Sequence, residues 1–239
     1  MDQHEIPQLM ELRALGDADR AAEMAAYHKA PRVYLGVPVP VIDALARGWR
    51  EGMPLEARLD LARILWASDL HEGRVAAAKL LTQARIRPDA EVWRLIASWV
   101  PDFDAWAIAD HAMGAGGRRL IAAPERLDEV ETWLDHGNFW VRRAALVGTL
   151  PWTRIRNPKP QEVAARDRIL IWLERLADDP EWFVQKAVGW WLRDLSKHDP
   201  RRVRDWLAVH GARLKPFALR EAGLWLPENR QARGGDVAE

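Results

Sequence analysis

Trp106 and Asp110 are the first residues in this chain whose types and spacing could do chemistry. Residues four apart on a helix are neighbours on one face, so the spacing predicts a carboxylate held against an indole. Phe103 and Met113 would lie beside this pair. Such a carboxylate can stabilise a developing cation or orient a water molecule, and it can equally be a surface aspartate at helical spacing.

A second candidate surface lies on the helix predicted from Glu181. Trp190 falls on its outward arc with Phe183, with Lys186 four residues before it and Arg193 three residues after it. An indole edged by cations can stack on a sugar or a base while the cations hold phosphates, whereas packing between helices is the alternative role for Trp190. The opposite arc is a hydrophobic stripe typical of a core face: Val184, Val188, Trp191, Leu192 and Leu195.

Two arginines, Arg142 and Arg143, lie near the start of the helix predicted at residues 139–150. In the sequence this helix falls between the helices that carry Trp106 and Trp190. Arg143 shares its arc with Phe139, Val147 and Leu150. Periodicity therefore leaves open whether its guanidinium faces solvent or extends from a packed face.

The charge of the chain is unevenly divided. Lys plus Arg and Asp plus Glu are both 35, so the formal net charge is zero. Residues 138–220 nevertheless hold 17 Lys and Arg against 9 Asp and Glu, a net charge of +8 that leaves −8 for the remainder. This local excess favours phosphate binding in the second half of the chain, and solvated helix faces of no special function are the alternative.

Other chemistries have little support. The chain has no cysteine, which excludes disulfides, cysteine-ligated metals and thiol nucleophiles. Its seven histidines show no spacing typical of metal ligands, so we expect neither a metal nor a cofactor. The glycine-rich stretch 114–119 follows a helix rather than a strand, so we interpret it as a helix C-cap and turn rather than a phosphate-binding loop.

Apolar residues recur at spacings of three and four along nearly the whole chain, which predicts an all-α protein. Proline at the first helical turn and aspartate before it mark several helix starts, Asp17 and Asp199 among them. The predicted helices span residues 6–15, 17–28, 40–51, 54–67, 71–83, 89–98, 103–113, 124–135, 139–150, 161–177, 181–196, 200–209 and 215–226.

An internal echo, that is, a short segment that recurs in similar form further along the chain, indicates a repeat architecture. Residues 139–144 align with residues 182–187 at an offset of 43, which is typical of HEAT or armadillo helix pairs. We therefore predict an α-solenoid with a concave basic groove, formed by one domain over residues 1–228. We expect residues 151–160 to form an exposed loop and residues 229–239 to form a flexible tail.

The N-terminus lacks the basic-then-apolar pattern of a secretory signal, and no apolar run approaches the roughly 18 residues of a membrane span. With the absence of cysteine, these features lead us to expect a soluble cytoplasmic protein. We also expect a monomer, although no sequence feature tests the oligomeric state.

Two motifs resemble the AlkD-like HEAT-repeat DNA glycosylases of alkylation repair. They are NFWVRRAA at 138–145 and KAVGWWLR at 186–193, and their combination is specific where either alone is weak. Residues 24–29, 34–40, 102–110 and 219–222 extend the resemblance over most of the chain. The sequence departs from the family at Ala107, where relatives more often carry a polar residue.

The resemblance implies a role for each matching residue. Trp106, Asp110 and Trp190 would form the catalytic cleft, and Arg143 and Arg193 would grip DNA phosphates. Some branches of the family have lost the cleft residues and excision with them, whereas this chain keeps all three.

The resemblance also implies a reaction without a metal. The family removes N3- and N7-alkylated purines from duplex DNA, and the base need not enter a pocket. The indoles would stabilise oxocarbenium character while Asp110 positions water. With Lys186 and Arg142 as further DNA contacts, we expect a DNA glycosylase acting in base excision repair. A non-catalytic DNA-structure binder and a protein-interaction scaffold are the alternatives.

Overall fold

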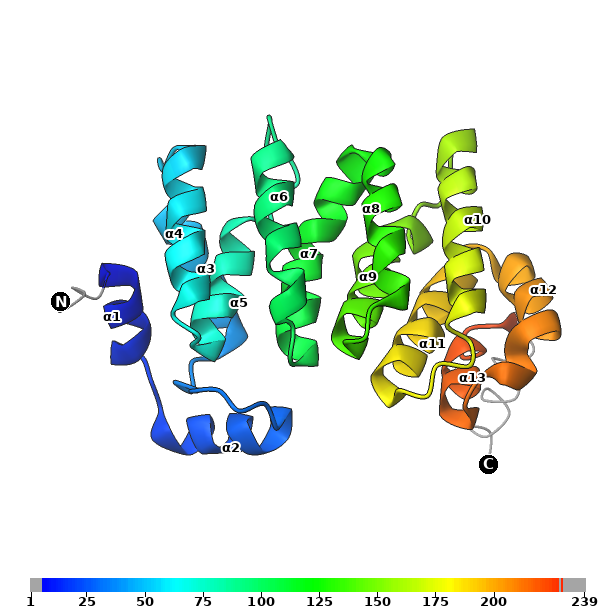
Figure 1. Ribbon diagram of the computed structural model, residues 1–239, viewed down its shortest axis with the longest axis horizontal. Helices are drawn as coiled ribbons and strands as arrows, with labels where there is room; N and C mark the ends of the chain where they lie inside the picture. The colour runs from blue at the N-terminus through cyan, green and yellow to red at the C-terminus, as the bar shows by residue number, and fades with distance from the viewer. Residues whose placement is uncertain (1–5, 228, 230–239) are drawn as a thin grey trace, which may run out of the picture. The chain divides into compact units, whose positions relative to one another are not determined.

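The computed structural model describes residues 6–227 and 229, and these form helices and connecting segments (Figure 1). A single backbone bridge between Val33 and Leu70 is the extended pairing found among them. The predicted all-α class is confirmed. Residues 230–239 of the predicted tail lie outside the described part, as do residues 1–5 and 228.

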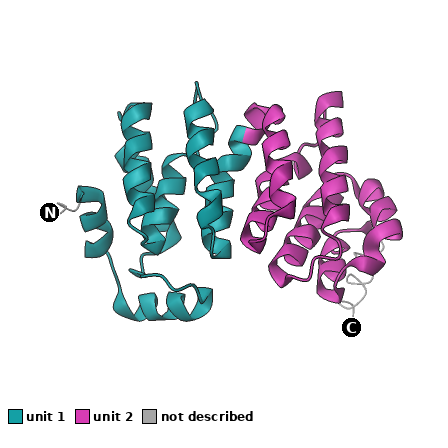
Figure 2. Cartoon of the chain, viewed as in Figure 1, with its two compact units in different colours: residues 1–119 teal, residues 120–239 magenta. Residues whose placement is uncertain are grey.

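The chain divides into two compact units at Arg119 and Leu120 (Figure 2). The single-domain expectation for residues 1–228 stays a prediction. Unit 1 contains α1 (Pro7–Ala14), α2 (Ala18–His28), α3 (Val39–Arg50), α4 (Leu55–Ala67), α5 (His71–Leu80), α6 (Ala90–Ser98), η1 (Val100–Asp102) and most of α7 (Trp106–Ala122). Unit 2 contains η2 (Pro124–Arg126), α8 (Leu127–Glu131), η3 (Thr132–Asp135), α9 (Phe139–Thr153), α10 (Pro160–Arg175), α11 (Trp182–Ser196), α12 (Pro200–His210), η4 (Gly211–Arg213) and α13 (Pro216–Ala222).

Helix α5 is the centre of unit 1 and packs against α3, α4 and α1. Its buried residues are mostly small, with a run of alanines from Ala76 to Ala78, so neighbouring helices can approach closely. Trp66 on α4 stacks on Trp99, the residue that ends α6, at 4.3 Å between ring centroids. Burial of apolar faces fixes α4 against α5, and the indole stack joins α4 to the end of α6.

Helix α11 is the centre of unit 2 and packs against α9, α12 and α13. All five residues of its predicted core stripe are buried. The 43-residue echo corresponds to α9 and α11, which begin at Phe139 and Trp182 and pack against each other. At Gly189 an added Cβ would lie 2.9 Å from the carbonyl oxygen of Ala218, so glycine permits the close approach of α13.

The aspartates at two predicted helix starts act as N-caps. Asp17 accepts a hydrogen bond from the Arg20 amide at 2.9 Å, and Asp199 accepts one from the Arg202 amide at 3.2 Å. Each satisfies an amide that the first helical turn leaves unpaired.

The interpretation of residues 114–119 as a C-cap and turn is wrong, because α7 continues through them to Ala122. Arg119 is fully buried, and its guanidinium donates to the carbonyls of Gln83, Ala84 and Ile86 at 2.7, 3.0 and 3.4 Å. These contacts with residues far away in the sequence stabilise a helical segment that glycine content alone disfavours.

The exposed loop predicted at residues 151–160 is shorter than expected. Helix α9 continues through Pro151 to Thr153, and Trp152 is only 1% exposed. Arg166 on α10 donates to the Trp152 carbonyl at 2.8 Å and to the Ile155 carbonyl. Burial of the indole therefore extends the helix, and the connecting segment is residues 154–159.

Much of the positive charge of unit 2 is paired within the unit. Arg168 contacts Asp128 and Glu131, both at 2.6 Å. Arg175 contacts Asp135 at 2.7 Å, and a similar pair joins Arg202 to Asp167. The net charge of residues 138–220 therefore overstates the number of cations that are available to a ligand.

Candidate functional site

Trp106 is the first residue of α7, and side chains from α2 pack against its ring. The ring centroid of His28 lies 5.1 Å away, and Tyr27 meets the indole edge-on at 5.9 Å with an interplanar angle of 87°. Asp110 follows one helical turn later, and both Trp106 and Asp110 are half-buried. Unit 1 thus positions the predicted indole and carboxylate on one helix and fixes the indole from a second helix.

A stack of aromatic rings lies behind His28. His71 is 4.8 Å from both His28 and Tyr34 between ring centroids. Within the described part of the chain, the Nδ1 atoms of His28 and His71 are buried without a hydrogen-bond partner. Sequence reasoning missed this cluster, because the three residues lie in separate segments and share no spacing pattern.

The histidines near Trp106 and Asp110 are uncharged at neutral pH. Burial, followed by the charges of His28, Arg32 and His111, lowers the pKa of His71 to about 3. Burial and the charge of Lys79 lower the pKa of His111, which directly follows Asp110, to about 4. Burial also lowers the pKa of His28, the imidazole that contacts Trp106, so these imidazoles are neutral at pH 7.

Glu72 holds the segment that connects α2 to α3. Its buried carboxylate accepts hydrogen bonds from the amides of Leu35, Gly36 and Val37 at 2.9, 2.8 and 3.3 Å. Gly36 has a φ of +83°, and a Cβ there would lie 2.2 Å from the Asp17 carbonyl oxygen. The glycine and the carboxylate together fix the segment that carries Tyr34 into the aromatic stack.

Trp190 in unit 2 is half-buried on α11 and is held by Asp194. The indole Nε1 donates to Asp194 Oδ2 at 3.2 Å. Burial would raise the pKa of Asp194, but the hydrogen bond from Lys197 and the charges of Lys197, Arg193 and Arg154 outweigh it, so the pKa is lowered. Asp194 is therefore an ionised, cation-paired carboxylate directly beside Trp190.

The two cations predicted beside Trp190 also have partners. Arg193 pairs with Glu221 of α13, and its Nη2 lies 3.4 Å from Asp194. The Lys186 Nζ atom lies 4.8 Å from the ring centroid of Trp182. The side chains of Arg193 and Lys186 are half-buried.

Arg142 and Arg143 donate to acceptors within unit 2. Arg142 Nε lies 2.7 Å from Asp179, and its Nη1 donates to the His136 carbonyl at 2.8 Å. Arg143 is only 3% exposed, and its Nη1 donates to the Phe183 carbonyl at 2.8 Å. Phosphate binding by these arginines stays a prediction, and their contacts in this structure support the helix starts around them.

The structure thus brings the predicted residues together in two groups. Trp106 and Asp110 share α7 in unit 1, whereas Trp190, Arg193 and Lys186 share α11 in unit 2. Arg142 and Arg143 lie on α9, which packs against α11.

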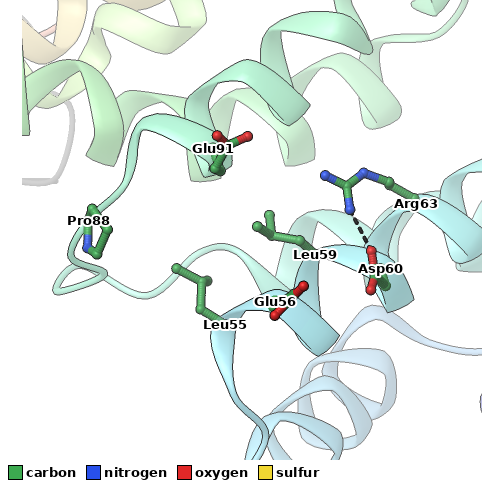
Figure 3. Close-up of a pocket in the computed structure, with 7 residues that line it drawn as sticks. All are labelled: Leu55, Glu56, Leu59, Asp60, Arg63, Pro88 and Glu91. Atoms are coloured by element: carbon green, nitrogen blue, oxygen red, sulfur yellow. Dashed lines mark hydrogen bonds and ion pairs between the residues drawn. The ribbon is translucent and has the colours of Figure 1, made fainter.

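A pocket of about 390 Å³ lies in unit 1 between α4 and α6 (Figure 3). Its lining includes both apolar and charged side chains, and Arg63 pairs with Asp60 at 2.6 Å. None of the predicted site residues lines it. The lining consists of Leu55, Glu56, Leu59, Asp60, Arg63, Pro88 and Glu91.

Residues 6–227 and 229 contain neither a metal-binding cluster nor a membrane-spanning helix. No cluster of three or more histidine or acidic side chains in this part of the chain is arranged to hold a metal ion. No helix there combines the length and the apolar character that crossing a bilayer requires.

The sequence model of the family described as DNA alkylation repair enzyme matches residues 9–226. The chain belongs to this family. No curated protein matches it.

A solved structure described as a predicted DNA alkylation repair enzyme from Enterococcus faecalis is 26% identical, with a TM-score of 0.73. The match covers 89% of this chain and 97% of that one. AlkD2 from Streptococcus mutans is 22% identical with a TM-score of 0.60, and the match covers 80% of this chain and 91% of that one. The smu.31 protein from Streptococcus mutans UA159 is 21% identical with a TM-score of 0.60, covering 79% and 92%. The last two likenesses show the fold alone.

Proposed function

We propose that this member of the DNA alkylation repair enzyme family is a DNA glycosylase. It would hydrolyse the N-glycosidic bond of cationic N3- and N7-alkylated purines in duplex DNA. The observation that carries the proposal is Trp106 with Asp110 one turn later on α7, together with Trp190 beside Arg193 on α11. Trp106 lies in unit 1 and Trp190 lies in unit 2.

In the proposed site Asp110 orients water and no side chain is assigned to protonate the base, which fits a substrate that is already cationic. An alkylated purine already carries positive charge, so it can leave without first being protonated. As the bond from C1′ to the base nitrogen breaks, its electron pair neutralises the base and the sugar acquires oxocarbenium character. Water then adds to C1′ and loses its proton, giving a free alkylated base and an abasic deoxyribose.

Asp110 would stabilise the developing sugar cation and orient the attacking water. The faces of Trp106 and Trp190 would add the attraction of their π systems for positive charge. The neutral state of His71 and His111 supports this assignment, because an imidazolium at either position would oppose a cationic transition state.

The test is a single-turnover release assay on duplexes that contain N7-methylguanine or N3-methyladenine. We expect Asp110→Asn to slow release at least about 100-fold, because it removes the charge aimed at the transition state. Asp60→Asn is the matched control, since Asp60 is an exposed carboxylate of unit 1 paired with Arg63. Excision by Asp110→Asn at the wild-type rate would disprove the catalytic assignment.

The same assay separates the two alternative functions. Salt-sensitive duplex binding with no released base would identify a non-catalytic DNA-structure binder. Absence of binding even at low salt would identify a protein-interaction scaffold. Cytoplasmic location and a monomeric state also stay predictions.

A further inference from the structure

Asp194 is a buried carboxylate whose two oxygens have different partners. Oδ2 accepts the Trp190 indole N–H at 3.2 Å and lies 3.5 Å from Arg154. Oδ1 lies 3.1 Å from Lys197 Nζ and 3.4 Å from two nitrogens of Arg193. The side chain is only 6% exposed, so both sets of contacts form largely away from water.

The fold does not need this carboxylate in order to bury an indole. Trp172 and Trp191 lie in the same unit, and within the described residues their buried Nε1 atoms have no hydrogen-bond partner. Trp190 is half-buried, so its N–H could have bonded to water instead. A buried charge is also unfavourable unless it is paired, so an apolar residue would satisfy packing at position 194 more simply.

We infer that Asp194 is a positioning residue for Trp190 and Arg193. Its Oδ2 orients the Trp190 indole and its Oδ1 orients the Arg193 guanidinium. The carboxylate therefore fixes the position of the aromatic face relative to the cation. The inference rests on the proposed function, in which Trp190 contacts the sugar of the damaged nucleotide. It adds a residue that touches no substrate but decides how the contacting residues are presented.

The spacing of Trp190 and Asp194 repeats that of Trp106 and Asp110, but the two aspartates have different surroundings. Asp194 is buried among three cations, which balance its charge. Asp110 is half-buried on α7. Asp194 therefore orients the indole beside it, whereas the proposed function assigns stabilisation of the substrate cation to Asp110.

The first test follows the indole itself. In a ¹H–¹⁵N spectrum of the full chain, the 14 tryptophans give indole signals, and the signal missing in Trp190→Phe identifies Trp190. We expect Asp194→Ala to shift this signal and to speed its hydrogen exchange by about tenfold or more, because the acceptor is lost. Asp194→Asn keeps an acceptor oxygen and should restore most of the protection.

Glu131→Gln is the control, because Glu131 is a carboxylate of unit 2 that pairs with Arg168 and Arg175. It should leave the Trp190 signal in place. The other indole signals report whether each variant is folded, and the near-isosteric Asp194→Asn serves if the alanine variant is not. An unchanged Trp190 signal in a folded Asp194→Ala protein would overturn the inference.

The second test is a double-mutant cycle in single-turnover excision at saturating protein. At saturating protein a weaker phosphate contact by Arg193 does not limit excision, so we expect Asp194→Ala to slow wild-type excision about tenfold but to change Trp190→Phe by less than about twofold. If the excision rate of the double variant is reduced by the product of the two single-variant reductions, the inference is refuted. If wild-type protein releases no base while the indole test succeeds, the positioning by Asp194 stands and the glycosylase proposal is wrong.

Discussion

Acidification should destabilise unit 1 through His71, and His71→Phe should remove much of that effect. Burial, together with the charges of His28, Arg32 and His111, lowers the pKa of His71 from 6.5 to about 3. The unfolded chain therefore binds the proton before the folded chain does. The stability that depends on the neutral imidazole is complete above pH 6.5 and is lost as the pH falls toward 3.

The magnitude follows from the two pKa values. At pH 5 the unfolded imidazole is almost fully protonated and the folded one is neutral, so the loss is roughly 2 kcal/mol relative to pH 7.5. Near that pH the free energy of unfolding should change by about 1.3 kcal/mol per pH unit through this residue. His111, with a pKa of about 4, adds a similar slope over the upper part of the range.

The assay is urea unfolding between pH 5.0 and 7.5, followed by tryptophan fluorescence. His71→Phe keeps an aromatic ring in the stack with His28 and Tyr34 but cannot be protonated. When the pH falls from 7.5 to 5, the free energy of unfolding should decrease by roughly 2 kcal/mol less in His71→Phe than in wild type.

Tyr34→Phe is the matched control for this experiment. It removes the hydroxyl from another ring of the same stack and leaves both imidazoles in place, so it should keep the wild-type pH dependence. If wild type and His71→Phe lose stability in parallel, protonation of His71 is not what destabilises the protein, and the reasoning is refuted.

Three further predictions concern unit 2. Arg142→Ala should lower the free energy of unfolding by about 2 kcal/mol, measured in urea, because it leaves the buried Asp179 carboxylate without its guanidinium. Gly189→Ala should lower the melting temperature, with a loss of about 1–3 kcal/mol, because its Cβ meets the backbone of α13. Glu221→Gln should strengthen duplex binding about threefold at low salt, measured by fluorescence anisotropy, because it releases Arg193 to bind phosphate. Unchanged stability in the first two variants, or unchanged or weaker binding in the third, would contradict these assignments.

Local pattern was sufficient to predict the helices and their buried faces. The stripe from Val184 to Leu195 on α11 is buried as its spacing requires, and the echo between Phe139 and Trp182 marks two helices that pack together. The caps at Asp17 and Asp199 were predictable for the same reason. These features depend on residues within one or two turns, and such residues are adjacent in sequence.

The places where local pattern failed are those decided by distant contacts. Glycines suggested a turn after residue 113, but burial of Arg119 against carbonyls more than 30 residues earlier carries α7 onward to Ala122. In the same way, burial of Trp152 extends α9 past the predicted loop. Neither contact has a signature within the segment it stabilises.

Residue type and spacing are local properties, so they are enough to predict that Trp106 with Asp110 and Trp190 with Arg193 could do chemistry. The tertiary structure alone decided what surrounds them. It placed His71 against His28, which contacts Trp106, and it brought Arg154 from the end of α9 to Asp194. Charge state and side-chain orientation depend on burial and on partners distant in sequence, so they exist only once the chain has folded.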